Sequence, residues 1–276
     1  MRLHAERHAM EISALGKEDI NEFLSLAGAE GWISGDWELD FLLAAFPRGC
    51  LVCRADGRAV GFVTSVKYDR SGWIGNLIVH PEWRGRGVGS ALLLRALAAL
   101  DEAGTRTVWL TASEAGRPIY ERLGFSAIDT IVRWEGQGSL DVSRKIAGTD
   151  EIVALDAAGW GDSRGLLIGR VLSRGPSCLL PSGFLVCQQW PGAVQLGPWS
   201  CADSASAAAL LGRAVVPCPG GVRMFLDVPE GSRAAPGLLR SDGFAAGSST
   251  TLMYRGDAPA YAPERIFALA SMGSMG

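Results

Sequence analysis

The chain lacks any long hydrophobic run, although 48% of its 276 residues are apolar. A helix that crosses a bilayer needs roughly 20 consecutive apolar residues, and no stretch of the sequence comes near that length. The opening residues, MRLHAERHAMEIS, also lack the apolar core of a signal peptide. We therefore expect a cytoplasmic globular protein that has no membrane partner.

The chain also has no large excess of basic or of acidic residues. The chain has 26 Lys and Arg against 29 Asp and Glu, a net charge of -3, which predicts no nucleic-acid partner. Among the 6 cysteines only Cys50 and Cys53 have the spacing of a metal or redox pair, and no second pair or nearby histidine completes a site. The sequence therefore predicts reduced, buried thiols and no metal.

What is present is a regular alternation of helices and strands. In the first half we expect helices near 17–30, 37–46 and 88–103, three strands between 50 and 80, and a strand, a short helix and a strand between 106 and 135. The stretch EGQGSLD, residues 135–141, reads as a linker. The pattern predicts an α+β fold with a mixed, mostly antiparallel sheet flanked by helices.

The second half repeats this order of elements. Leu110 precedes the Gly of a Gly-Phe pair, Gly124, by 14 positions, and Leu226 precedes the Gly of a second such pair, Gly243, by 17, each time across a short helix. We predict two tandem copies of one fold. The expected domains are residues 1–137 and residues 138–276.

A glycine-rich turn, RGRGVG, joins a strand to a helix at residues 84–89. The first amides of a helix have no internal partner and carry the positive end of its dipole. Glycines let successive N–H groups point into one concavity, and Arg84 and Arg86 add charge. The turn is a candidate phosphate site, although these residues alone leave a simple tight turn open.

The context of that turn resembles a known family. NLIVHPEWRGRGVGSALL followed by PIYERLGF is similar to the GNAT superfamily of N-acetyltransferases over about residues 5–135. Arg84, Gly87 and Gly89 match its loop motif. The resemblance implies that acetyl-CoA is the cofactor. It also implies that the coenzyme contacts Leu77, Ile78, Val79, Arg84, Gly85, Arg86, Gly87, Val88, Gly89, Ser90, Ser113 and Tyr120.

The second half resembles the C-terminal domain of a tandem GNAT group, often called YitH-like. The matching landmarks are LDAAGWGDSR, LGPW, FLDVP and the ending LMYRG…FALAS. Its strand–helix junction, LGPWSCADSASAAALL, lacks the glycine motif, and Asp203 stands where a phosphate needs positive charge. We expect Asp203 to cap the helix, and we expect one coenzyme site per chain.

The resemblance implies acetyl transfer to the amine of a small-molecule or amino-acid-like acceptor by direct attack. Tyr120 is the candidate proton donor for the leaving thiolate, because a phenol is protonated at neutral pH. Asn76 is a candidate to position the amine or a water. For the base, Asp36 acting through water is preferred to Glu30 and Glu38.

The acceptor side is predicted from aromatic and charged residues. Trp32, Trp37 and Trp73 are candidates to line it, although core packing explains them equally well. Asp227, with Asp162 and Arg164, is a candidate to shape it. An ion pair of Arg164 with Asp162 or Asp156 is the alternative.

Two other functions fit the same residues: an acyl-CoA sensor with weak catalysis, and an acetyltransferase that acts on proteins or peptides. The chain is expected to be a monomer, in which the two copies form a pseudo-dimer, or a homodimer.

Overall fold

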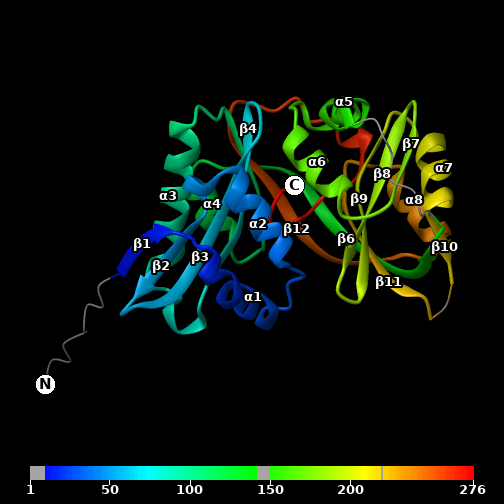
Figure 1. Ribbon diagram of the computed structural model, residues 1–276. Coiled ribbons are helices and arrows are strands. Elements are labelled where there is room, and N and C mark those ends of the chain that lie inside the picture. The colour runs from blue at the N-terminus through cyan, green and yellow to red at the C-terminus, as the bar shows by residue number, and fades with distance from the viewer. Residues whose placement is uncertain (1–9, 142–148, 219) are drawn as a thin grey trace, which may run out of the picture. The chain divides into compact units, whose positions relative to one another are not determined.

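The computed structural model describes residues 10–141, 149–218 and 220–276. The chain forms two compact units, one containing residues up to 67 together with 74–104, the other containing residues 68–73 and 105–276 (Figure 1). Within the described ranges no helix is long and apolar enough to cross a membrane.

The first unit is a small sheet with three helices. Strands β1 (Met10–Ala14), β2 (Leu51–Ala55) and β3 (Arg58–Lys67) are antiparallel neighbours. Strand β4 (Ser71–Val79), which belongs to this unit from Ile74 on, follows β3 in the sheet. The helices are α1 (Ile20–Ala29), α2 (Asp36–Ala45) and α3 (Val88–Glu102). The three expected helices and the three strands expected between 50 and 80 are confirmed.

Helices packed on β3 hold the glycine-rich turn in place. Phe23 of α1 meets Phe62 of β3 edge to face, with ring centroids 5.8 Å apart. The apolar stripe of α3 is buried, and the Cβ that Gly61 of β3 lacks would lie 2.9 Å from Val88. Because α3 lies this close to the sheet, its first residues are held rigidly after the turn.

The second unit is a larger mixed sheet. Its strands run in the order β5-β12-β6-β11-β9-β8-β7, with β10 beside β6 and β13 beside β9. Their bounds are β5 Thr107–Ala112, β6 Ser126–Leu140, β7 Ser177–Leu180, β8 Gly183–Trp190, β9 Ala193–Cys201, β10 Val215–Pro217, β11 Val222–Pro229, β12 Ala245–Gly256 and β13 Ile266–Ala268. The helices are α4 Arg117–Arg122, α5 Thr149–Trp160, α6 Gly165–Leu172, α7 Ser204–Ala214 and α8 Ala235–Ser241.

The two copies repeat their parallel strand pairs. Ser71–Trp73 at the start of β4 pairs in parallel with Thr107–Trp109 of β5, and Ala193–Gln195 of β9 pairs in parallel with Arg223–Phe225 of β11. Each pair is followed by a short helix and an antiparallel strand. This confirms the internal repeat, with mixed, mostly antiparallel strands.

The last strands of the two copies are exchanged. β5 is hydrogen-bonded to β12 of the second copy. β11 is hydrogen-bonded to β6 of the first copy, and both strands are labelled in Figure 1. β6 and β12 pair with each other in the centre. Each copy is therefore completed by a strand of the other, while the predicted domain limits at 137 and 138 stay a prediction.

The linker expected at residues 135–141 is wrong. Residues up to Leu140 continue β6, and Gly136 and Gly138 pair with β11. A Cβ at Gly136 would lie 2.7 Å from the Phe244 ring, and one at Gly138 would lie 3.0 Å from the Val216 carbonyl oxygen. These glycines allow close packing within a sheet, although glycine runs usually indicate a flexible connection.

Candidate functional site

The glycine-rich turn of the first unit ends in an uncapped helix. Gly85 and Gly87 have φ of 73° and 85°, in the left-handed region, which glycine adopts without strain. The first hydrogen bond of α3 runs from the Ala91 amide to the Gly87 carbonyl, and no side chain caps the helix. The amides of Val88, Gly89 and Ser90 therefore precede the helical ladder and suit an anion.

The two arginines of this turn differ in their partners. Arg84 donates from Nε to the Val79 carbonyl at 3.0 Å, and from Nη2 to the Glu30 carboxylate. Arg86 stacks its guanidinium over the Trp83 ring at 4.9 Å and has no ion pair with any residue the structure describes. Arg86 therefore supplies the uncompensated positive charge, whereas that of Arg84 is balanced by Glu30.

Asn76 interrupts the regular backbone of β4. Its φ is 53°, and its buried side chain donates from Nδ2 to Thr64 Oγ1 of β3 at 3.1 Å. A left-handed residue inside a strand redirects the amides that follow it. Leu77, Ile78 and Val79, the predicted coenzyme contacts, come directly after this change of direction.

The remaining predicted residues of the first unit differ in exposure. Asp36 is exposed at the start of α2, and its Oδ1 accepts from the Trp37 amide at 2.8 Å. Glu38 and Trp37 are buried, while Trp32 is 40% exposed. Because Glu30 is bound to Arg84, Asp36 is the candidate base that remains accessible.

Tyr120 and Ser113 lie together in the second unit, around α4. Ser113 Oγ accepts from the Gly116 amide at 3.2 Å, which holds the start of the helix. The Tyr120 ring packs edge to face on Phe125, with centroids 6.0 Å apart. Burial raises the pKa of Tyr120 to about 12, because a phenolate loses solvation there, so the phenol keeps its proton at neutral pH.

Trp73 belongs to a buried aromatic cluster. The ring is 1% exposed and packs edge to face on Trp160 of α5, which in turn contacts Trp109 of β5 and Tyr261. α5 covers this face of the strand pair, and a role for Trp73 in lining the acceptor side stays a prediction. Core packing, the alternative, describes its contacts.

Two buried ion pairs account for the charged candidates of the second unit. Arg133 of β6 donates to both oxygens of Asp227 at 2.8 and 2.9 Å, and Asp227 has no exposed surface. Arg164 donates to both oxygens of Asp156 at 2.8 and 2.7 Å. The ion-pair alternative for Arg164 is confirmed. The Asp227–Arg133 pair was missed, because 94 positions separate the two residues.

The junction of the second copy is closed to an anion. Asp203 caps α7, accepting from the Ser206 amide at 2.8 Å and from Ser206 Oγ at 2.9 Å. These hydrogen bonds lower the pKa of Asp203, so it is negatively charged at neutral pH. The expected capping role is confirmed, and the negative charge opposes phosphate binding at this helix.

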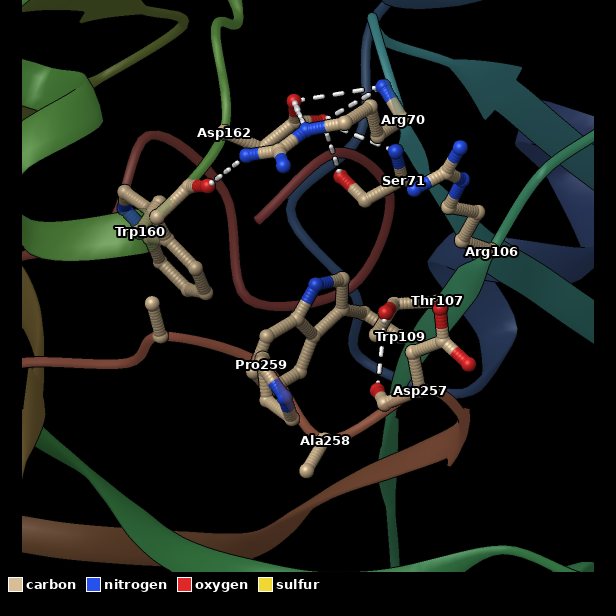
Figure 2. A pocket seen from close by; sticks show the side chains of 12 residues that line it. Arg70, Ser71, Arg106, Thr107, Trp109, Trp160, Asp162, Asp257, Ala258 and Pro259 are labelled. Atoms are coloured by element: carbon tan, nitrogen blue, oxygen red, sulfur yellow. Dashed lines mark hydrogen bonds and ion pairs between the residues drawn. The ribbon is translucent and has the colours of Figure 1, made fainter.

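A pocket of about 180 Å³ in the second unit is lined in part by Asp162, one of the candidates to shape the acceptor side. Figure 2 shows Asp162 and Arg70 along one side and Arg106 and Asp257 along another. Asp162 accepts from the amide and the hydroxyl of Ser71 at 2.8 and 2.7 Å. The pocket lies at the amino ends of β4 and β5.

The cysteines are all free thiols, and Cys218 alone is not buried. Burial raises the pKa of Cys50 to about 11. Across the described residues no cluster of His, Cys, Asp and Glu forms a metal site.

Comparisons with known proteins agree with this geometry. The model of the acetyltransferase (GNAT) family matches residues 18–125, and a model of an acetyltransferase (GNAT) domain matches residues 152–268. An uncharacterized N-acetyltransferase from Archaeoglobus fulgidus is 31% identical over 147 residues, which are 47% of this chain and 98% of that protein.

Other relatives are matched in part or in fold. An uncharacterized N-acetyltransferase from Methanocaldococcus jannaschii is 30% identical over 108 residues, 36% of this chain and 48% of that protein. The chain spans about half the length of the first curated relatives it matches. The crystal structure of a Pyrococcus horikoshii protein designated an acetyltransferase covers 100% of both chains with a TM-score of 0.80 at 20% identity, which shows a shared fold.

The resemblance of both halves to GNAT domains is thereby confirmed, and the finer YitH-like assignment stays a prediction. Two family models in tandem, a relative matched over nearly its whole length and an uncapped helix after a left-handed glycine turn lead to one conclusion: the chain belongs to the GNAT family of acetyltransferases.

Proposed function

We propose that the protein is an acetyl-CoA-dependent N-acetyltransferase that acylates the amine of a small-molecule or amino-acid-like acceptor by direct attack. The observation that supports it most is the turn at residues 84–90. It combines two left-handed glycines, three helix amides without helical acceptors and the unpaired charge of Arg86.

The residues of this turn fit the diphosphate of a coenzyme. A Cβ at Gly85 or Gly87 would meet nothing within 4 Å, so the surface above the turn is open. The amides of Val88, Gly89 and Ser90 would donate to phosphate oxygens, and Arg86 would neutralise their charge. The strand residues Leu77 and Ile78 would hold the coenzyme arm through their backbone.

Acetyl-CoA, when bound, supplies an acyl group activated as a thioester. The chain's own side chains are proposed to remove the proton of the acceptor amine and to protonate the leaving thiolate. Asp36, exposed at the start of α2, is proposed to accept the acceptor's proton through water, and Asn76 to position that amine. The phenol of Tyr120 is proposed to hold a proton for the leaving thiolate, and its raised pKa keeps it a donor.

The second copy is proposed to contribute no coenzyme site. Its junction carries the negative Asp203 as a helix cap and lacks the glycine motif. One coenzyme per chain follows, and the chain acts as a monomer built like a dimer or as a homodimer.

The test is calorimetric titration with coenzyme A of wild type, Gly87→Asp and Gly192→Asp. Gly192 is a matched control, because its φ is 73° and a Cβ there also meets nothing within 4 Å. We expect one coenzyme A per wild-type chain, loss of binding in Gly87→Asp through charge and blocked amides, and unchanged binding in Gly192→Asp.

Turnover separates the candidate functions. Thiol release from acetyl-CoA is measured with ethanolamine, phenethylamine, tryptamine, spermidine and the peptide Ala-Ala-Ala. Release with a small amine supports the proposal, and release with the peptide alone supports a peptide acetyltransferase. Binding of acetyl-CoA without release on any amine supports the sensor. The absence of coenzyme A binding by wild type contradicts all three.

A further inference from the structure

The pocket of about 180 Å³ is formed entirely by residues of the second unit. Arg70 and Arg106 directly precede β4 and β5, and the Arg106 amide donates to the Arg70 carbonyl at 2.8 Å. The rim of the pocket is therefore continuous with the parallel pairing of Ser71 with Thr107. A rim that is fixed by a sheet costs little ordering when a ligand binds.

One side of the pocket is balanced in charge. Asp162 is buried, and besides Ser71 it holds the Arg70 amide, which donates to its Oδ2 at 3.1 Å. The Arg70 guanidinium has its Nε 3.7 Å from Asp162 Oδ1 and donates from Nη2 to the Gly161 carbonyl at 2.8 Å. The charges of Asp162 and Arg70 therefore offset each other on this side.

The other side carries two opposite charges that do not pair. Arg106 and Asp257 lie across from each other between β5 and β12, one position beyond the paired Thr107 and Gly256. The Asp257 amide donates to the Arg106 carbonyl at 2.9 Å. Opposite charges at such positions have Cβ atoms about 5 Å apart and stabilise the strand pair. Among the residues that the structure describes, however, neither Arg106 nor Asp257 has an ion pair.

The two side chains diverge. Figure 2 shows the Arg106 guanidinium turned toward the side of the pocket where Ser71 lies, whereas the Asp257 carboxylate stays near Thr107. Both side chains are exposed, so a ligand from solvent reaches them. A molecule that carries a carboxylate and an ammonium group on one carbon would bridge the two charges with charge-assisted hydrogen bonds.

The aromatic part of the lining limits what else the pocket can hold. Trp109 and Trp160 are 2% and 3% exposed and pack edge to face with centroids 5.6 Å apart. Rings buried this far offer no open face on which a cation could stack. The cavity volume is also below the roughly 300 Å³ at which pockets for drug-sized ligands begin. The occupant is therefore small and is recognised by its charges.

We propose that this pocket binds a free, small aliphatic α-amino acid, such as alanine or valine, with its carboxylate on Arg106 and its ammonium group on Asp257. Asp162 and Asp257 oppose a dianion, and Arg70 and Arg106 oppose a simple cation, because like charges brought together are repelled. A zwitterion satisfies both. None of these residues binds coenzyme A or moves a proton in the proposed acetyl transfer, so the site is independent of that function.

Calorimetric titration of the full chain without acetyl-CoA tests the chemistry of the ligand. L-alanine and L-valine are compared with L-lactate, in which a hydroxyl replaces the ammonium group, and with L-alaninamide, in which an amide replaces the carboxylate. We expect one L-alanine per chain, with L-lactate and L-alaninamide bound about tenfold or more weakly. L-tryptophan should bind at least as weakly, because of its size. If any of the three binds as tightly as L-alanine, the proposed recognition is wrong.

Substitutions locate the binding site. Arg106→Gln and Asp257→Asn should each weaken L-alanine binding about tenfold or more. Arg122→Gln and Asp150→Asn also change exposed side chains, but outside the pocket, and should keep wild-type affinity. Circular dichroism checks that all four variants keep the wild-type thermal transition. Wild-type affinity in either pocket variant places the amino acid elsewhere and overturns the inference, as does a wild type that binds neither L-alanine nor L-valine.

Discussion

At the scale of single residues, Tyr120 connects burial with chemistry. Its pKa is raised to about 12 by desolvation, so the protonated phenol dominates below that pH and is lost only above it. We predict that Tyr120→Phe lowers kcat about 10²- to 10⁴-fold with unchanged coenzyme A affinity, because the ring contact with Phe125 is retained. When thiol release is measured from about pH 6 to about pH 10, the wild-type rate should not fall at the alkaline end.

The matched control is Tyr254→Phe, which keeps a ring beside Trp109. It should leave kcat at the wild-type value. Tyr120→Phe with wild-type kcat would remove this phenol from the mechanism.

Single residues also show which features of the site the sequence could predict and which it could not. The motif located the turn at residues 84–90, because glycine's left-handed freedom is a property of the residue itself. Motif reading gave both arginines the same role, yet Arg84 is bound to Glu30, 54 positions away, and Arg86 is not. Ion pairs between distant residues depend on tertiary packing, which local patterns do not contain.

At the scale of elements, periodicity located most helices and strands well. The helices expected near 17–30, 37–46 and 88–103 are observed at Ile20–Ala29, Asp36–Ala45 and Val88–Glu102. The glycines of residues 135–141 led to the wrong prediction of a linker, because a glycine that permits flexibility in a linker also permits close packing in a sheet. Only the partner strand decides between the two.

Gly136 provides a test of that explanation. Gly136→Ala places a Cβ 2.7 Å from the Phe244 ring and should lower the free energy of unfolding by about 1–3 kcal/mol. Gly212→Ala, on an open face of α7, should raise it by about 0.5–1 kcal/mol. Urea unfolding followed by circular dichroism measures both, and equal stability of the two variants would contradict close packing at Gly136.

At the scale of the whole molecule, the exchange of β6 and β12 is the feature that no local pattern indicates. Both strands have the same place in their copies, so either pairing satisfies the hydrophobic pattern. In the structure β5 has β12 as its antiparallel neighbour, and β6 lies between β12 and β11. The repeat is therefore readable from the sequence, while the pairing of its last strands is not.

The exchange predicts how the chain behaves when it is divided between its repeats. A fragment of residues 1–137 retains β5 without β12 and most of β6 without either neighbour, and unpaired strand edges promote aggregation. We expect fragments 1–137 and 138–276 to be insoluble or to lack a cooperative thermal transition when expressed alone. Expressed together, they should form a 1:1 complex with the circular dichroism spectrum of the intact chain. If each fragment folds alone as a stable monomer, each copy can pair its own last strand, and the exchange is not required for folding.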